Sequence, residues 1–193
     1  MDATVIPRTT QAAPTDDDLV RAAQLALPAF EQLYQRYVND VYRFCRRRLD
    51  SDADAADATS AIFTRALANI KACQPATFRA WLYAIGRNVV TDHYRALHPT
   101  QVLDESLEVV VSAAGPEEVA IQHDESRSLA NVLRRLSDEQ RAVIELRLAG
   151  LTGNEIAIAL GKSRNAIDQA QFRAISRLRT LLVPPTVMMD EPR

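Results

Sequence analysis

The sequence predicts an all-α protein made of two small helical domains joined by a flexible acidic linker. Apolar residues recur at three- and four-residue steps, helix caps and Gly or Pro stops bound these segments, and no segment shows strand alternation. A length of 193 residues accommodates two small domains. We expect helical domains at 29–98 and 127–183, an acidic linker at 99–126, a disordered N-terminal tail at 1–28 and a C-terminal tail at 184–193.

The first domain is expected to contain three helices. One begins at Phe30 and closes on the basic run 46–48, whose charges complement the negative end of the helix dipole. A second runs from about 52 to 70, and Pro75 blocks its continuation. A third runs from about 78 to 97. Its expected buried face comprises Phe78, Trp81, Leu82, Ile85, Val89 and Tyr94.

The second domain has clear helix boundaries. Two capping boxes, Ser137 with Gln140 and Thr152 with Glu155, begin helices at about 138 and 153. Gly161 ends the second of these helices, and a further helix follows from 164 to about 182. A short helix, a glycine turn and another helix describe a helix-turn-helix. A plain helical hairpin that binds no ligand is the alternative.

The last helix presents a polar and basic face that is suited to a major groove. Arg and Asn side chains bond base edges bidentately, and basic side chains hold phosphates. Asp168 on this face either weakens binding by facing phosphates or accepts from a cytosine amino group. The expected DNA-binding residues are Arg164, Asn165, Asp168, Gln169, Phe172 and Arg173.

The net charge of −2 conceals a segregated distribution. Residues 30–98 carry 10 basic and 7 acidic side chains, and residues 127–183 carry 10 and 5. Residues 99–126 carry 7 acidic side chains and none that is basic. Two basic blocks separated by an acidic connector favour binding to a polyanion, although ordinary solvated helix surfaces are an equal alternative on charge alone.

Other classes of protein are disfavoured. No apolar stretch approaches the roughly 18 residues of a membrane span, and the N-terminus lacks the pattern of a secretory signal. Two cysteines, Cys45 and Cys73, cannot build a disulfide framework, and the three histidines lack metal-ligand spacing. We therefore expect a cytoplasmic protein with no membrane insertion, no metal, no cofactor and no enzymatic activity.

Two blocks of the chain, Phe30–Leu97 and Leu133–Leu182, resemble the extracytoplasmic function (ECF) sigma factors of bacterial RNA polymerase. The first block is similar to their second conserved region and the other to their fourth. The helix-turn-helix alone is widespread among regulators, but both blocks in this order make the resemblance specific. The stretches that carry it are Phe30–Tyr37, Phe63–Leu67 and Phe78–Asn88, the last continuing to Asp92 and Arg95.

The resemblance implies a sigma factor that directs polymerase core to a subset of promoters and helps melt them. Asp54, Asp57 and Phe63 would bind core at the clamp helices of its largest subunit. The loop 71–77 would capture a flipped base of the minus-ten element, and the last helix would read the minus-thirty-five element. Residues implied at the minus-ten DNA are Lys71, Arg79, Arg87, Asn88, Asp92 and Arg95.

Individual residues leave alternatives open. The spacing of eight places Arg79, Arg87 and Arg95 roughly on one side of a helix, whereas Trp81 is expected in the core. Asp92 either contacts DNA or pairs with Arg87 or Arg95.

Several residues depart from the family pattern. They are Ala56, Ser60 and Ala61 in the polymerase-binding patch and Asp168 and Ala170 in the last helix. The alternatives are thus a sigma-derived DNA-binding regulator with weakened polymerase binding, or a protein-interaction adaptor. The resemblance also suggests an anti-sigma factor as a partner.

Overall fold

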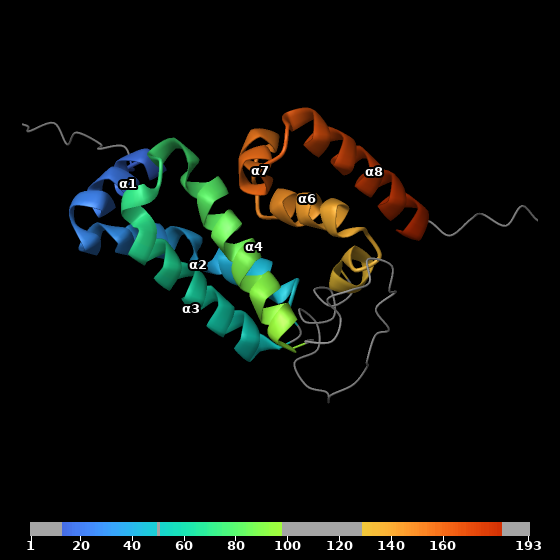
Figure 1. Ribbon diagram of the computed structural model, residues 1–193, viewed down its shortest axis with the longest axis horizontal. Coiled ribbons are helices and arrows are strands. Elements are labelled where there is room, and N and C mark those ends of the chain that lie inside the picture. Colours follow the sequence, from blue (N-terminus) through green and yellow to red (C-terminus); the bar gives the residue numbers. More distant parts are fainter. Residues whose placement is uncertain (1–12, 50, 98–128, 183–193) are drawn as a thin grey trace, which may run out of the picture.

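The computed structural model describes residues 13–49, 51–97 and 129–182, and their regular structure is helical throughout. The all-α class is therefore confirmed (Figure 1). Residues 129–133 are helical, and three short 3-10 turns cover Leu27–Ala29 (η1), Ile70–Ala72 (η2) and Pro75–Thr77 (η3). The other helices are α1 (Asp16–Leu25), α2 (Phe30–Arg46), α3 (Asp52–Asn69), α4 (Phe78–Leu97), α6 (Asp138–Leu148), α7 (Gly153–Leu160) and α8 (Arg164–Leu182).

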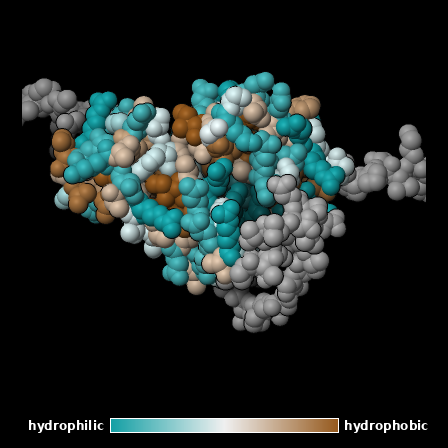
Figure 2. Space-filling model, viewed as in Figure 1, coloured by the Kyte–Doolittle hydropathy of each residue, from teal (hydrophilic) through white to brown (hydrophobic). Residues whose placement is uncertain are grey.

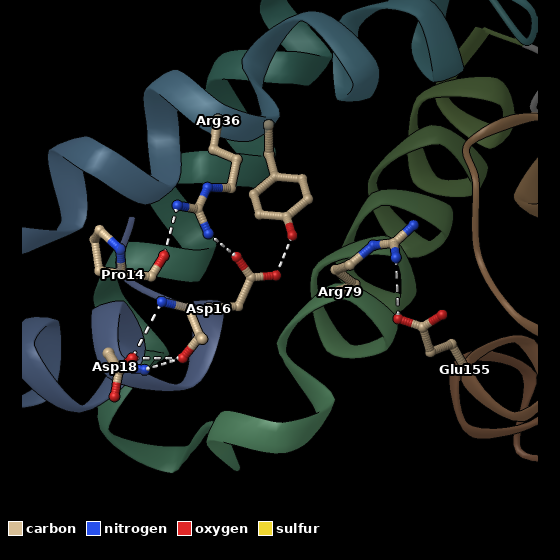
Figure 3. Close-up of polar contacts among 8 residues, drawn as sticks. Pro14, Asp16, Asp18, Arg36, Arg79 and Glu155 are labelled. Carbon is tan, nitrogen blue, oxygen red and sulfur yellow. Dashed lines mark hydrogen bonds and ion pairs between the residues drawn. The ribbon is translucent and has the colours of Figure 1, made fainter. Parts of the chain in front are cut away.

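The expected disordered tail at 1–28 is wrong from residue 16 onward, because α1 and η1 occupy that segment. Thr15 and Asp18 form a capping box at the start of α1. Asp16 accepts hydrogen bonds from Arg36 and from the Tyr37 hydroxyl, both on α2 (Figure 3). The helix also buries Leu19, Val20 and Ala23. Local capping and distant pairing together order this segment.

The first domain packs α2, α3 and α4 around one apolar core. The rings of Phe44 and Tyr83 meet edge to face with centroids 5.4 Å apart, and both side chains are buried. Gly86 of α4 lies against this core, where an added Cβ would stand 3.3 Å from Phe44 Cε1. The absence of a side chain at Gly86 therefore lets α4 approach its neighbours closely.

The second domain contains the expected helix-turn-helix. Both predicted capping boxes are present, at Ser137 with Gln140 and at Thr152 with Glu155. Gly161 ends α7 with φ of 62°, a left-handed conformation that glycine adopts without strain.

The two domains lie against each other rather than apart (Figure 1). Helix α7 packs on α4, and buried side chains of α6 and α7 join the core of the first domain. Figure 2 shows that the visible surface is mainly hydrophilic, with apolar residues in separate patches. The expected linker 99–126 and tail 184–193 lie outside the described residues. No helix in the described part of the chain is long and apolar enough to cross a membrane.

Candidate nucleic-acid interface

An open hollow of about 290 Å³ lies between the C-terminal part of α3, the turn η2 and the middle of α4. We call it the α3–α4 hollow. It combines two side-chain amides, one arginine and the indole of Trp81. An aromatic face can stack on an unpaired base, and amides can bond the base edge. The residues that line the hollow are Arg65, Asn69, Ala72, Trp81, Ile85 and Asn88.

Trp81 was expected in the core, but its side chain is only partly buried and faces the hollow. Its ring packs against the buried ring of Phe78, with ring centroids 6.1 Å apart and an interplanar angle of 42°. Residues 81, 85 and 88 share a helix face through steps of four and three, and the last of them is polar. That polar member is the sequence signal that this face borders the open α3–α4 hollow.

The loop beside the hollow is held by Gln24 of α1. The Gln24 Nε2 donates hydrogen bonds to the carbonyl oxygens of Ile70 at 3.1 Å and Cys73 at 2.7 Å. These two bonds bracket Lys71 and Ala72, and Ala72 lines the hollow. Sequence reasoning missed Gln24, because α1 was expected to be disordered and the bonded carbonyls are more than 40 residues away.

The residues expected at the minus-ten DNA divide into two groups. Four of them are exposed, namely Lys71 in the turn η2 and Asn88, Asp92 and Arg95 on α4. Arg87, also on α4, is half-buried. Asp92 lies 3.3 Å from Arg65 Nη1 of α3, so it pairs with neither of the arginines that were considered.

Arg79 contacts the second domain in this structure. Its guanidinium donates to the Gly150 carbonyl oxygen at 2.6 Å. It also lies 3.5 Å from Glu155 Oε1 (Figure 3). The expectation that Arg79 acts with Arg87 and Arg95 on one DNA-facing side is therefore not met in this conformation.

The expected polymerase-binding residues lie on α3. Asp57 is exposed, and Asp54 is half-exposed with Oδ1 at 3.5 Å from His93 Nε2. Phe63 is 4% exposed and packs edge to face against Tyr34, with centroids 4.8 Å apart. The side chain of Phe63 therefore forms part of the core in this structure, and its contact with polymerase stays a prediction.

The six residues expected at the minus-thirty-five DNA are all exposed on α8. Phe172 is 73% exposed, which is unusual for an aromatic side chain that serves only to pack. Arg164 Nε lies 2.9 Å from both carboxylate oxygens of Asp168, so the acid on this face is matched by a cation. Ala170 is buried in the domain core and therefore cannot contact DNA.

In the described residues no group of His, Cys, Asp and Glu is placed to hold a metal ion.

Comparison with known proteins decides the family. Residues 33–99 match Sigma-70 region 2 and residues 126–178 match Sigma-70 region 4. The ECF RNA polymerase sigma factor SigD of Mycobacterium tuberculosis strain H37Rv is 32% identical over 155 residues, covering 74% of this chain and 72% of SigD. The chain belongs to the ECF RNA polymerase sigma factors. Helix α1 with Gln24 precedes the first matched region of this sigma factor.

Further relatives agree in fold and sequence. The ECF sigma factor BldN of Streptomyces coelicolor is 35% identical over 171 residues, covering 86% of this chain. The chain spans 65% of the length of BldN and 63% of that of SigE from Mycolicibacterium smegmatis. The solved structure of CnrH, in complex with the cytosolic domain of CnrY, superposes with a TM-score of 0.68 at 26% identity, over 86% of this chain and 96% of CnrH.

Proposed function

We propose that this sigma factor brings bacterial RNA polymerase core to a subset of promoters and helps to melt them. The α3–α4 hollow is the observation that carries this proposal. It offers Trp81 as a stacking face and the amides of Asn69 and Asn88 for hydrogen bonding. Melting requires unpaired bases to be held outside the duplex stack, and such a hollow provides that environment.

The second DNA contact of the proposal is the exposed face of α8. This face combines cationic, amide and aromatic groups on a helix that the helix-turn-helix holds at its N-terminal end. Phe172 is suited to apolar contact with a thymine methyl group, and Arg173 to a phosphate. We assign this face to the upstream, minus-thirty-five element.

The proposal includes two protein partners. Polymerase core would contact the exposed Asp57 and the half-exposed Asp54 on α3 through its clamp helices. Ala56 and Ser60 are also exposed there and offer less polar contact than the family pattern. The family resemblance suggests an anti-sigma factor as the second partner, and the similar protein CnrH has been solved in complex with another protein, the cytosolic domain of CnrY. With these partners, we expect the protein to act in the cytoplasm, by binding rather than by catalysis.

The proposed function is tested by incubating the full-length protein with purified bacterial core polymerase, followed by pull-down and run-off transcription on genomic fragments. Binding together with new transcripts supports an initiation factor. Binding of DNA fragments without any binding of core would instead favour the alternative, a sigma-derived regulator that has lost polymerase contact.

We expect Gln24→Ala to lower the yield of open promoter complexes by at least about three- to tenfold, since even one of its two hydrogen bonds contributes about 0.5–1.5 kcal/mol to holding the loop. Permanganate footprinting of open complexes measures this yield. Gln35→Ala is the matched control, because Gln35 is exposed on α2 and bonds only its neighbour Glu31 among the contacts described. Equal yields from the two variants would show that Gln24 does not position the loop.

We expect Arg173→Ala to weaken binding to minus-thirty-five DNA about equally across sequences. A phosphate contact is independent of sequence, and its loss reduces the slope of log affinity against log salt by about one. Fluorescence anisotropy of labelled duplexes at several salt concentrations measures both quantities. A loss confined to particular sequences would mean that Arg173 reads a base edge instead.

A further inference from the structure

The acid on the outer face of α8 is paired with the first residue of the same helix. Arg164 Nε lies 2.9 Å from both carboxylate oxygens of Asp168, about one turn further along α8. The terminal nitrogen Nη1 of Arg164 also donates to the side-chain oxygen of Asn154 on α7, at 3.2 Å. We call Arg164, Asp168 and Asn154 the Arg164 triad. Helices α7 and α8 pack together (Figure 1), so the guanidinium is held from both helices of the helix-turn-helix.

Space for this guanidinium exists because residue 153 is a glycine. A Cβ added to Gly153 would stand 2.5 Å from Arg164 Nη1 and 2.7 Å from Arg164 Nε. Both distances are far shorter than an ordinary van der Waals contact, which is about 3.5–4.0 Å between carbon atoms. Gly153 is a helical residue of α7, where alanine would be the better helix former. Glycine at this position therefore costs helix stability and provides the space that Arg164 occupies.

The Arg164 triad leaves part of the guanidinium available to a ligand. An arginine side chain carries five N–H groups, and Asp168 and Asn154 engage one each among the hydrogen bonds of the described residues. The other N–H groups are on the terminal nitrogens Nη1 and Nη2, which pair bidentately with the O6 and N7 acceptors of guanine. The side chain of Arg164 is 48% exposed, so about half of it is accessible to a base.

The charge of the pair favours base reading over attraction to phosphates. Arg164 and Asp168 carry opposite charges, so together they add nothing to the net charge of this face. Non-specific affinity for DNA comes from cations that neutralise phosphates and release counterions, and the Asp168 carboxylate offsets that gain. A base contact instead benefits from an arginine that is already held in one orientation, because less side-chain entropy is lost on binding.

The position of Arg164 in the fold agrees with base reading. In a helix-turn-helix the N-terminal residues of the second helix contact base edges in the major groove. Arg164 is the first residue of α8, the second helix of this motif. The held guanidinium therefore lies at the end of α8 that reaches the bases.

We propose that Arg164 reads a guanine in the major groove of the upstream element, and that Asp168, Asn154 and Gly153 are positioning residues that fix the orientation of its guanidinium. This role rests on the proposed function, which assigns the exposed face of α8 to that element. Asp168 then neither repels phosphates nor reads a cytosine, the two roles considered from the sequence. It acts through Arg164 and touches no base itself.

Selection from a promoter library tests the proposal. The library starts from a promoter found by the run-off assay and is randomised across the upstream element. Holoenzyme formed from the full-length protein and purified core is incubated with the library, and sequencing of the bound DNA gives the base preference at each position. The wild type should prefer guanine at one position by about tenfold or more, the discrimination that a bidentate arginine provides.

Three variants disturb the Arg164 triad in different ways. Arg164→Ala removes the reading group, Asp168→Ala removes its support, and Gly153→Ala keeps both groups but fills the space of the guanidinium. Each should lower the guanine preference at the same position about tenfold. Asp168→Ala should also leave affinity for unrelated DNA unchanged or higher, because it removes a negative charge. Asp138→Ala is the matched control, since it removes an exposed acid of α6 that lies outside the triad.

A double variant shows whether the two residues act through one contact. Arg164→Ala combined with Asp168→Ala should discriminate no worse than Arg164→Ala alone, because the support has no effect once the reading group is gone. Circular dichroism checks that each variant keeps its helices, and Gly153→Ala tests the proposal even if a variant that removes a charge unfolds.

Four results would overturn the proposal. A uniform loss of affinity across all sequences in Arg164→Ala would show a phosphate contact. Relaxation of a different base pair in Asp168→Ala than in Arg164→Ala would show that the acid reads a base itself. A guanine preference that survives all three variants would remove the role of the triad alone. A wild type without base preference at any upstream position would contradict the assignment of α8 to that element as well.

Discussion

Glu145→Ala is expected to lower the free energy of unfolding by about 3–5 kcal/mol, because removing one partner from a buried ion pair leaves uncompensated charge behind. Here the charges left behind are the guanidinium groups of Arg48 and Arg141, whose side chains are less than one-fifth exposed. Urea denaturation measures the change. Trp81, the single tryptophan, reports the first domain by fluorescence, and circular dichroism reports both domains. The two signals should coincide in the wild type and separate in the variant.

Glu139→Ala is the matched control for this substitution. Glu139 lies on the same helix, but it is partly exposed and pairs with Lys162 at the surface, where such pairs contribute about 1 kcal/mol or less. If Glu145→Ala destabilised the protein no more than Glu139→Ala, the ion pairs of Glu145 with Arg48 and Arg141 would not hold the domains together.

The helix boundaries of the second domain were predictable because their causes are local. Thr152 and Glu155 stand three residues apart and satisfy each other's backbone groups, and Gly161 permits the left-handed turn that follows. No distant residue is needed for either signal. The all-α class followed from the same kind of local information, since helical periodicity is visible within a single segment.

The interdomain contacts were not predictable, because their partners are far apart in sequence. Glu145 stands between Ile144 and Leu146 on an amphipathic helix, and nothing nearby indicates that Arg48, 97 residues away, will meet it. Arg79 and Gly150 are separated by 71 residues. Helix α1 shows a mixed case. Its capping box joins Thr15 to Asp18 and is a local signal that was not recognised, whereas the bonds from Arg36 and Tyr37 to Asp16 require the folded core.

The candidate site was predictable in part for the same reason. Asn88 in the middle of a helix is a poor helix former, which favours a functional role, and the structure places it at the α3–α4 hollow. The sequence-based interpretation assigned Phe63 to a surface contact and Trp81 to the core. In the structure Phe63 is buried and Trp81 is only partly buried. Both are large aromatic residues in periodic segments, and periodicity does not distinguish a side chain that fills the core from one at its rim.

Trp81→Ala is expected to lower the rate of open-complex formation on the order of tenfold to a hundredfold, because stacking of a base on an aromatic ring contributes about 1–3 kcal/mol. Stopped-flow fluorescence of a promoter labelled near the minus-ten element measures this rate in the presence of core polymerase. Because Trp81 is only partly buried, the variant should retain its helical circular dichroism spectrum.

Trp81→Phe keeps an aromatic face in the α3–α4 hollow and should recover most of the rate. Asn88→Ala should lower the rate without changing the stacking face, because it removes an exposed amide at the rim. The pair of variants separates stacking from hydrogen bonding. Equal rates for Trp81→Ala and the wild type on the same promoter would exclude the α3–α4 hollow as the place where the melted base is held.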